Sequence, residues 1–284
     1  MARPLRIEYE GACYHITARG NAQQHIFLTE SDRYAFLDIL VTAVSRFGWL
    51  CHAYCLMGNH YHLLLETPSA NISRGMQYLN ARYTQKFNRR HGRTGHVLQG
   101  RFHSVLVEKQ AYLLEVVRYI ELNPVRAGLV KHPAAWPWSS CRATAGRANP
   151  PDFLHVEWVL SQFHADPEQA KQAYRLFVSQ GRDANPWTSL QGSILGNNAF
   201  VKAMKPLLSG RTVSTEFPRR DRLATRPPLD VLFASVDDIR SRNAKLYEAV
   251  HIHQYTITEV ARFLGLHYST VSHAVRRQHR GVRS

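Results

Sequence analysis

Two histidines separated by one residue give this sequence its clearest candidate for metal chemistry. His60 and His62 lie in the segment GNHYHLLLETP, residues 58–68. The apolar run and the Gly58-Asn59 reversal before it predict a β-strand, in which side chains two residues apart point to the same face. Both imidazoles could therefore bind one ion. The competing interpretation is a pair of ordinary polar residues on a sheet face.

A second histidine pair provides an internal comparison. The chain has 16 histidines in 284 residues, so about one pair with this spacing is expected by chance. His251 and His253 have the same spacing, but their segment predicts a helix, where residues two apart point to different sides. Of the two pairs, the first is the candidate metal site.

A tyrosine and an asparagine four residues apart could complete that site. Tyr119 and Asn123 lie in VVRYIELNPVRAG, residues 116–128, which predicts a helix ended by Pro124. One helix face would then present a phenol nucleophile and an amide oxygen ligand. Tyr112 is a rival nucleophile on the same face. The alternative role of Tyr119 is that of a core aromatic residue.

The order of the predicted elements indicates the fold that must position these residues. Periodicity, capping residues and turn residues predict strands over 12–21, 49–57, 60–68 and 101–109, and helices over 29–48, 71–92 and 110–123. The order β-α-β-β-α-β-α implies an α+β domain whose mostly antiparallel sheet has helices packed on one face.

The chain divides into four predicted regions. Residues 1–145 would form the catalytic domain, residues 146–210 a helical extension, residues 211–229 a polar, proline-containing linker, and residues 230–284 a small all-α domain. In the last region a small residue, a glycine and a branched apolar residue have the spacing of a helix-turn-helix, namely Ala261, Gly265 and Val271.

The charge of the chain indicates a polyanionic partner. The formal net charge is +15, and the basic residues are spread through both halves instead of forming one tail or one amphipathic helix. Nucleic acid is therefore expected and a membrane surface is not. The first 15 residues lack an apolar signal core, and the four cysteines include no C-x-x-C pair, so we expect a cytoplasmic protein with reduced thiols.

Basic and polar residues in three places are candidate DNA contacts. Helix 71–92 interleaves basic residues with Tyr78, Tyr83 and Phe87, which could stack on bases or form the buried face of the helix. The catalytic region contributes Arg82, Lys86, Arg89, Arg90, Arg101, Arg118 and Arg126. The second helix of the helix-turn-helix contributes Tyr268, Ser269, Thr270, Ser272, His273, Arg276 and Arg277.

Four ordered motifs over about residues 1–140 resemble a known family. YHITARGN, GNHYHLLLETP, QGRFHSVLVEK and RYIELNPVRAG occur in the order found in the IS200-like single-tyrosine HUH transposases, and are similar to the branch of REP-associated tyrosine transposases. The resemblance implies a ferredoxin-like core in which His60, His62 and Asn123 hold Mg²⁺ or Mn²⁺ and Tyr119 is the nucleophile.

The same resemblance implies a reaction and a substrate. The enzyme would nick and rejoin single-stranded or hairpin REP-like DNA through a 5′-phosphotyrosine intermediate, with a monomer favoured over a dimer. The C-terminal region resembles the duplex-reading domain of bacterial replication initiators, so duplex DNA is a further expected partner. The alternatives are a catalytically silent DNA-binding regulator and an RNA-processing protein.

Overall fold

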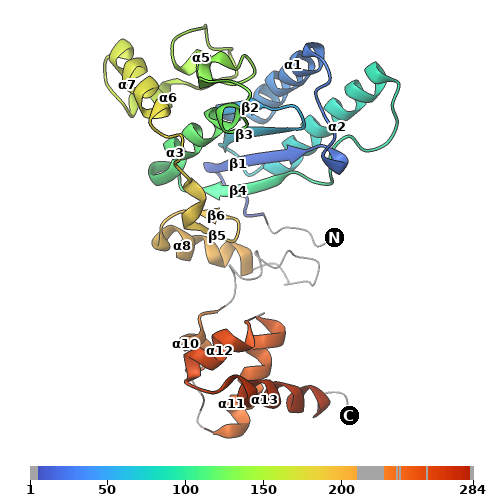
Figure 1. Cartoon of the computed structure of the whole chain (residues 1–284), viewed down its shortest axis with the longest axis vertical. Coiled ribbons are helices and arrows are strands. Elements are labelled where there is room, and N and C mark those ends of the chain that lie inside the picture. The colour runs from blue at the N-terminus through green and yellow to red at the C-terminus, as the bar shows by residue number, and fades with distance from the viewer. Residues whose placement is uncertain (1–5, 210–226, 235, 237, 254, 282–284) are drawn as a thin grey trace. The chain divides into compact units, whose positions relative to one another are not determined.

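The strands of the predicted catalytic region form a sheet with ferredoxin-like order. In the computed structural model, which describes residues 6–209, 227–234, 236, 238–253 and 255–281, the first four strands are antiparallel neighbours in the order β2-β3-β1-β4 (Figure 1). They are β1 (Ala12–Arg19), β2 (Leu50–Leu56), β3 (His60–Thr67) and β4 (His103–Val107). The predicted α+β class and the ferredoxin-like core are confirmed.

Two short strands, not predicted from the sequence, extend the sheet beyond β4. Strand β6 (Ile194–Leu195) pairs with β4 in parallel, and β5 (Leu190–Gln191) pairs antiparallel with β6. The full sheet is therefore mixed, with the order β2-β3-β1-β4-β6-β5. Its outer edge is built by a segment that follows β4 by more than 80 residues of sequence.

Helices cover both faces of the sheet, which corrects the predicted packing on one face. Tyr61 on β3 contacts the ring of Phe36 on α1 and donates a 2.6 Å hydrogen bond to Asn80 on α2, so α1 (Glu30–Phe47) and α2 (Ile72–His91) share one face. Leu64, of opposite parity, packs with Val116 and Ile120 of α3 (Lys109–Glu121) on the other face. Residues of both parities in β3 are largely buried, so both faces of the strand are covered.

The segment after α3 packs onto the α3 side of the sheet. The buried carboxyl of Glu121 accepts hydrogen bonds from Ser140 Oγ at 2.6 Å and from the Tyr174 hydroxyl at 3.4 Å, which ties α3 to α7. The elements of this segment are α4 (Asn123–Arg126), η2 (Pro133–Ala135), α5 (Cys141–Thr144), α6 (Glu157–Ser161), α7 (Pro167–Ser179) and η3 (Pro186–Ser189). Residues Arg6–Val201 form one compact unit, so residues 146–201 of the predicted extension lie in the same unit as the candidate catalytic residues.

The remaining described residues belong to a second compact unit that starts at Lys202. Its small core buries Leu246, Val260 and Val271 completely. Gly265 has a left-handed backbone (φ +65°) at the turn between α12 and α13, where glycine is favoured. Its C-terminal helices are α10 (Leu229–Leu232), α11 (Ile239–Tyr247), the π-helical turn η4 (Glu248–Ile252), α12 (Ile257–Leu264) and α13 (Tyr268–Gly281). The helix-turn-helix spacing is therefore realised, while residues 211–226 of the predicted linker lie outside the described residues.

Within the part of the chain that the structure describes, no helix has the length and apolar character needed to cross a membrane. The chain also contains α8 (Asn198–Ser209) and the short 3-10 turn η1 (Asn21–Gln23).

The close contact between Gly75 of α2 and Trp49, which follows α1, leads to a stability prediction. A Cβ atom at this position would lie 2.0 Å from Cζ2 of the buried Trp49, whose indole donates to Asn71. Alanine normally stabilises a helix interior by about 1 kcal/mol relative to glycine. Here the clash reverses the sign, and Gly75→Ala should lower the free energy of unfolding by about 1–3 kcal/mol in urea denaturation.

Gln77→Ala is the matched control for this substitution. Gln77 is exposed on the same helix, so its replacement should change the free energy of unfolding by no more than about 0.5 kcal/mol. A Gly75→Ala variant as stable as the wild type would contradict the close Trp49 contact.

Candidate active site

A cavity of about 480 Å³ opens on the α3 face of the sheet. Three adjacent strands meet there in register: Thr17 of β1 pairs with His62 of β3 and with His103 of β4. His15, His60 and Tyr119 also line the cavity. Period-two alternation turns these strand residues toward α3 and leaves the intervening apolar residues against α1 and α2.

His62 is held by a histidine that the sequence analysis did not select. Nε2 of His15 lies 2.9 Å from Nδ1 of His62, and the two rings are stacked with their centroids 5.2 Å apart. With the shared proton on His62 Nδ1, the lone pair of His62 is on Nε2. That Nε2 atom is buried and has no hydrogen-bond partner in the structure.

His60 has a similar arrangement. Its Nδ1 lies 2.7 Å from the side-chain oxygen of Asn59, which fixes Nδ1 as the protonated nitrogen and leaves Nε2 as the acceptor. The ring centroids of His60 and His62 are 5.0 Å apart. Partners that orient the second ring nitrogen are typical of histidines that bind metals.

The electrostatic environment keeps these histidines neutral. Burial, together with the neighbouring His15 and His60, holds the pKa of His62 well below its ordinary value. Burial and the nearby Arg19 lower the pKa of His60, and burial with His103 lowers the pKa of His15 to about 3. Neutral imidazole is the form that binds metal.

The donor set of the pocket therefore fits a divalent cation. The buried and unpaired Nε2 of His62 is the observation that supports this fit. Among the described residues no group of three or more His, Cys, Asp or Glu side chains is arranged to hold an ion. Two imidazoles alone would leave several coordination positions for water and phosphate oxygens, as Mg²⁺ sites commonly do.

Of the two candidate tyrosines, only Tyr119 lines the pocket. Its ring centroid lies 6.1 Å from that of His15 and 6.1 Å from that of His62. Both tyrosines are half-buried against the apolar core under α3, but Tyr112 does not line the pocket. Spacing along the helix could not decide which tyrosine is the candidate nucleophile. The packing of α3 on the sheet distinguishes them, because it brings only Tyr119 to the pocket.

Asn123 makes hydrogen bonds to the last turn of α3. Its side-chain amide donates to the carbonyl oxygen of Tyr119 at 2.9 Å and to that of Ile120 at 3.4 Å, at the end of α3. It is not among the residues that line the pocket. The structure therefore brings together three of the predicted site residues, His60, His62 and Tyr119, and gives Asn123 a helix-ending role.

The basic residues of α2 lie on the face of the sheet opposite the histidines. Tyr83 and Phe87 are buried, so their interpretation as base-stacking residues is wrong, whereas Tyr78 is half-buried. Arg90 pairs with the buried Asp32 at 2.8 Å and Lys86 lies 3.7 Å from Asp38. Arg82 and Arg89 are exposed. Any DNA bound by these side chains would lie across the sheet from the pocket.

The three other arginines of this unit that were predicted to contact DNA differ in their surroundings. Arg101 is exposed just before β4. Arg118 pairs with Glu115 and places its guanidinium 4.2 Å from the ring centroid of Phe177, facing α7. Arg126 donates four hydrogen bonds to backbone carbonyls. The guanidinium groups of Arg118 and Arg126 therefore make contacts within the protein. These contacts give no support to the prediction that the two residues contact DNA.

In the second unit, the predicted contact residues that can be described are on the surface of α13. Tyr268, Ser269, Thr270 and His273 are exposed and Ser272 is half-buried, while Val271 is fully buried. The side chains of Arg276 and Arg277 lie outside the described residues. Helix α13 therefore buries Val271 and presents polar side chains on its surface.

Sequence reasoning missed two residues that contact Tyr119 or its neighbours. His15 lies in the predicted first strand, and its alternation with Thr17 was the available signal. Trp187 lies in η3; its ring stacks on His15 with centroids 4.9 Å apart and meets Tyr119 edge to face at 5.0 Å. No periodic pattern in that segment indicated its location.

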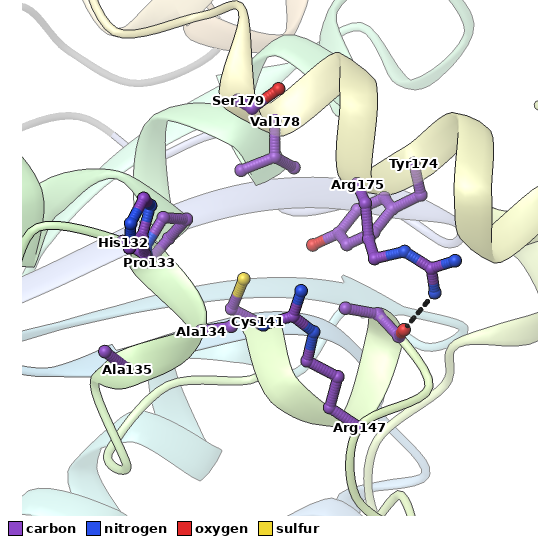
Figure 2. Close-up of a pocket in the computed structure, with 11 residues that line it drawn as sticks. His132, Pro133, Ala134, Ala135, Cys141, Arg147, Tyr174, Arg175, Val178 and Ser179 are labelled. Atoms are coloured by element: carbon purple, nitrogen blue, oxygen red, sulfur yellow. Dashed lines mark hydrogen bonds between the residues drawn. The ribbon is translucent and has the colours of Figure 1, made fainter.

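A second cavity, of about 420 Å³, lies between α7 and the segment of η2 and α5 (Figure 2). Arg147, Arg175 and His132 line it, and Arg175 donates a hydrogen bond to the carbonyl of Ala145. None of the predicted site residues lines this cavity. The predicted residues His60, His62 and Tyr119 line the histidine pocket and not this cavity.

The fold and the pocket together define a ferredoxin-like domain that presents a histidine pair and one tyrosine on a single face of its sheet. Residues 8–123 match the model of the family described as "Transposase IS200 like". The resemblance inferred from the four motifs is therefore confirmed over this part of the chain.

Two individual proteins are also similar to this chain. A "Putative REP-associated tyrosine transposase" of Haemophilus influenzae is 30% identical over 99 residues, which are 31% of this chain and 56% of that protein. The chain thus spans little more than half the length of this curated relative. A solved structure of a REP-associated tyrosine transposase bound to a REP hairpin has a TM-score of 0.45 and 19% identity, covering 55% of this chain and 92% of that one.

Proposed function

We propose that the unit Arg6–Val201 nicks and rejoins single-stranded DNA through a covalent link to Tyr119. One observation carries the proposal: the Tyr119 ring faces the stacked His15 and His62 rings, each at 6.1 Å between centroids, in an open pocket of about 480 Å³. A phenol beside two oriented, neutral imidazoles is a suitable constellation for phosphoryl transfer.

The reaction would exchange one phosphodiester bond for another. The Tyr119 hydroxyl loses its proton, its oxygen attacks the scissile phosphorus, and the bond from phosphorus to the 3′ oxygen breaks. The departing oxygen takes up a proton and becomes a 3′-hydroxyl, while a 5′-phosphotyrosine remains on the enzyme. Attack by another 3′-hydroxyl reverses the step, so joining needs no nucleotide cofactor.

His60 and His62 would hold the divalent cation through their Nε2 atoms. The ion, Mg²⁺ or Mn²⁺, would polarise the scissile phosphate and stabilise the charge of the transition state. His15 orients His62, and Asn59 orients His60, by the hydrogen bonds to their Nδ1 atoms. Asn123, four residues after Tyr119, donates to the carbonyl oxygen of Tyr119, so its contribution would be to hold the helix end that carries this residue.

The substrate class is supported by relatedness and by charge. The relative from Haemophilus influenzae is named a REP-associated tyrosine transposase, and the net charge of +15 suits a polyanion. We extend that substrate class to this chain and propose REP-like hairpins with single-stranded flanks. A pocket open to solvent and only half-covered at Tyr119 is compatible with an unpaired strand.

The second unit would add affinity for duplex DNA. The exposed polar face of α13, with Tyr268, Thr270 and His273, has the composition of a recognition helix. The turn at Gly265 and the buried Val271 support a helix-turn-helix that binds the stem or flanking duplex.

The test is incubation of the full chain with hairpins that carry a labelled single-stranded flank, with Mg²⁺ or Mn²⁺, followed by denaturing gels and peptide mass spectrometry. We expect a metal-dependent DNA adduct on Tyr119 and a free 3′-hydroxyl on the released strand. Tight hairpin binding without an adduct would overturn the enzymatic proposal and leave a DNA-binding regulator.

A further inference from the structure

A strap of residues 181–195, which lies outside the segment that matches the transposase family, reaches the nucleophile. Trp187 in this strap meets Tyr119 edge to face, with 5.0 Å between ring centroids, and stacks on His15 at 4.9 Å with an interplanar angle of 27°. Leu190 of the same strap also lines the pocket. The family match ends at residue 123, so these contacts are an addition to the matched core.

Arg126 fastens the first end of the strap to the nucleophile's helix. Its Nε donates to the carbonyl of Arg182 at 3.1 Å, and its Nη2 donates to those of Gly181 at 3.2 Å and Ala184 at 2.8 Å. Its Nη1 donates to the carbonyl of Tyr119 at 3.1 Å. A guanidinium has five N–H groups, and four hydrogen bonds leave little capacity for a DNA phosphate.

The sheet fastens the other end. Strand β6 pairs in parallel with β4, and the backbone N–H of Glu108 donates to the carbonyl of Leu195 at 2.8 Å. The Glu108 carboxylate accepts two further hydrogen bonds from Asn197, each of 2.7 Å. Trp187 therefore lies in a segment that is anchored on both sides of it.

The Tyr119 ring is consequently held from two directions. The guanidinium carbon of Arg126 lies 4.9 Å from the ring centroid, and the Trp187 ring packs against it edge to face. Within the described residues the Tyr119 hydroxyl has no hydrogen-bond partner, so contacts of the ring and backbone fix its direction. Small displacements of a reacting group can cost about 100-fold in rate.

We propose that the strap is a positioning device for the nucleophile, with Trp187 and Arg126 as positioning residues for Tyr119. This inference rests on the proposed function of Tyr119. Trp187 holds the ring in the direction of the histidine pair, and Arg126 links the strap to the backbone of Tyr119. Neither side chain is assigned a contact with DNA.

Single-turnover kinetics on the labelled hairpin separate positioning from DNA binding. Trp187→Ala should lower the rate constant of adduct formation at saturating DNA about tenfold or more, with the Kd for the hairpin within about twofold of wild type. Trp187→Phe, which keeps an aromatic ring, should recover most of the rate. Thr188→Val, in the same turn but exposed, is the matched control and should behave as wild type.

Substitutions of Arg126 distinguish a clamp on backbone carbonyls from a contact with a DNA phosphate. A phosphate contact would be largely preserved in Arg126→Lys, because lysine keeps the charge, whereas the four-carbonyl clamp requires the guanidinium fork. We expect Arg126→Lys and Arg126→Met to slow adduct formation equally, with the hairpin Kd and its salt dependence unchanged. If Arg126→Met weakens binding and lowers the salt slope by about one while Arg126→Lys does not, the clamp assignment is overturned.

Fluorine NMR tests the positioning without relying on turnover. In protein labelled with 3-fluorotyrosine, the Tyr119 resonance is identified by its loss in Tyr119→Phe. It should shift in Trp187→Ala and return toward its original position in Trp187→Phe. An unchanged Tyr119 resonance in Trp187→Ala would overturn the inference, even if the wild-type enzyme formed no adduct and the proposed function failed.

Discussion

Replacement of Tyr119 by phenylalanine is expected to lower the rate of strand cleavage by about 1000-fold or more and to abolish the covalent adduct. The substitution removes only the hydroxyl oxygen that would attack phosphorus. The ring contacts with Trp187, His15 and His62 persist, and no hydrogen bond from the hydroxyl is lost within the described structure. Folding and hairpin binding should therefore match those of the wild type, as measured by thermal melting and fluorescence anisotropy.

Tyr112→Phe is the matched control, because Tyr112 is on the same helix but packs against the core and not in the pocket. It should cleave at the wild-type rate and form the adduct at Tyr119. Cleavage that survives in Tyr119→Phe and disappears in Tyr112→Phe would show that the helix presents the other tyrosine to DNA.

The local part of this site could be predicted from the sequence. Period-two alternation in β3 places His60 and His62 on one face, and a helix ended near Pro124 carries Tyr119. These inferences need only the geometry of one strand or one helix. The α+β class followed from the order of the elements, and the antiparallel pairing of β2 with β3 followed from their short connection. The ferredoxin-like strand order was implied by the resemblance to the transposases.

The parts that depend on long-range packing could not be predicted in this way. The contact of His15 with His62 depends on the register of β1 against β3, and Trp187 reaches the pocket only because β6 joins the far edge of the sheet. A basic residue such as Arg126 resembles a phosphate contact in sequence, yet its guanidinium points to backbone carbonyls. Charge gives no information about the direction of a side chain.

His62→Ala is expected to remove most of the metal affinity of the pocket and to lower the cleavage rate by about 100-fold or more. Loss of a residue that hydrogen-bonds to a metal ligand typically lowers metal affinity or activity roughly 10- to 100-fold. Loss of the ligand itself should lower them further. His15→Ala removes the hydrogen bond to Nδ1 of His62 and the ring contacts of His15, but no proposed metal ligand, so it should give the smaller effect on metal affinity. Electron paramagnetic resonance of Mn²⁺ measures binding directly, without DNA or turnover.

The second histidine pair supplies the control for this prediction. His253, which lies 3.3 Å from a carboxylate oxygen of Glu248 in the second unit, has the same sequence spacing to its partner as His62 but a helical context. His253→Ala should retain wild-type Mn²⁺ affinity and cleavage rate. If His62→Ala binds Mn²⁺ as tightly as the wild type, the unpaired Nε2 of His62 is not a metal ligand, and the phosphate must be activated by other groups around Tyr119. The Mn²⁺ affinity and the cleavage rate should both fall in His62→Ala and stay unchanged in His253→Ala. That result would show that the strand geometry of the first pair, and not its sequence spacing alone, makes the metal site.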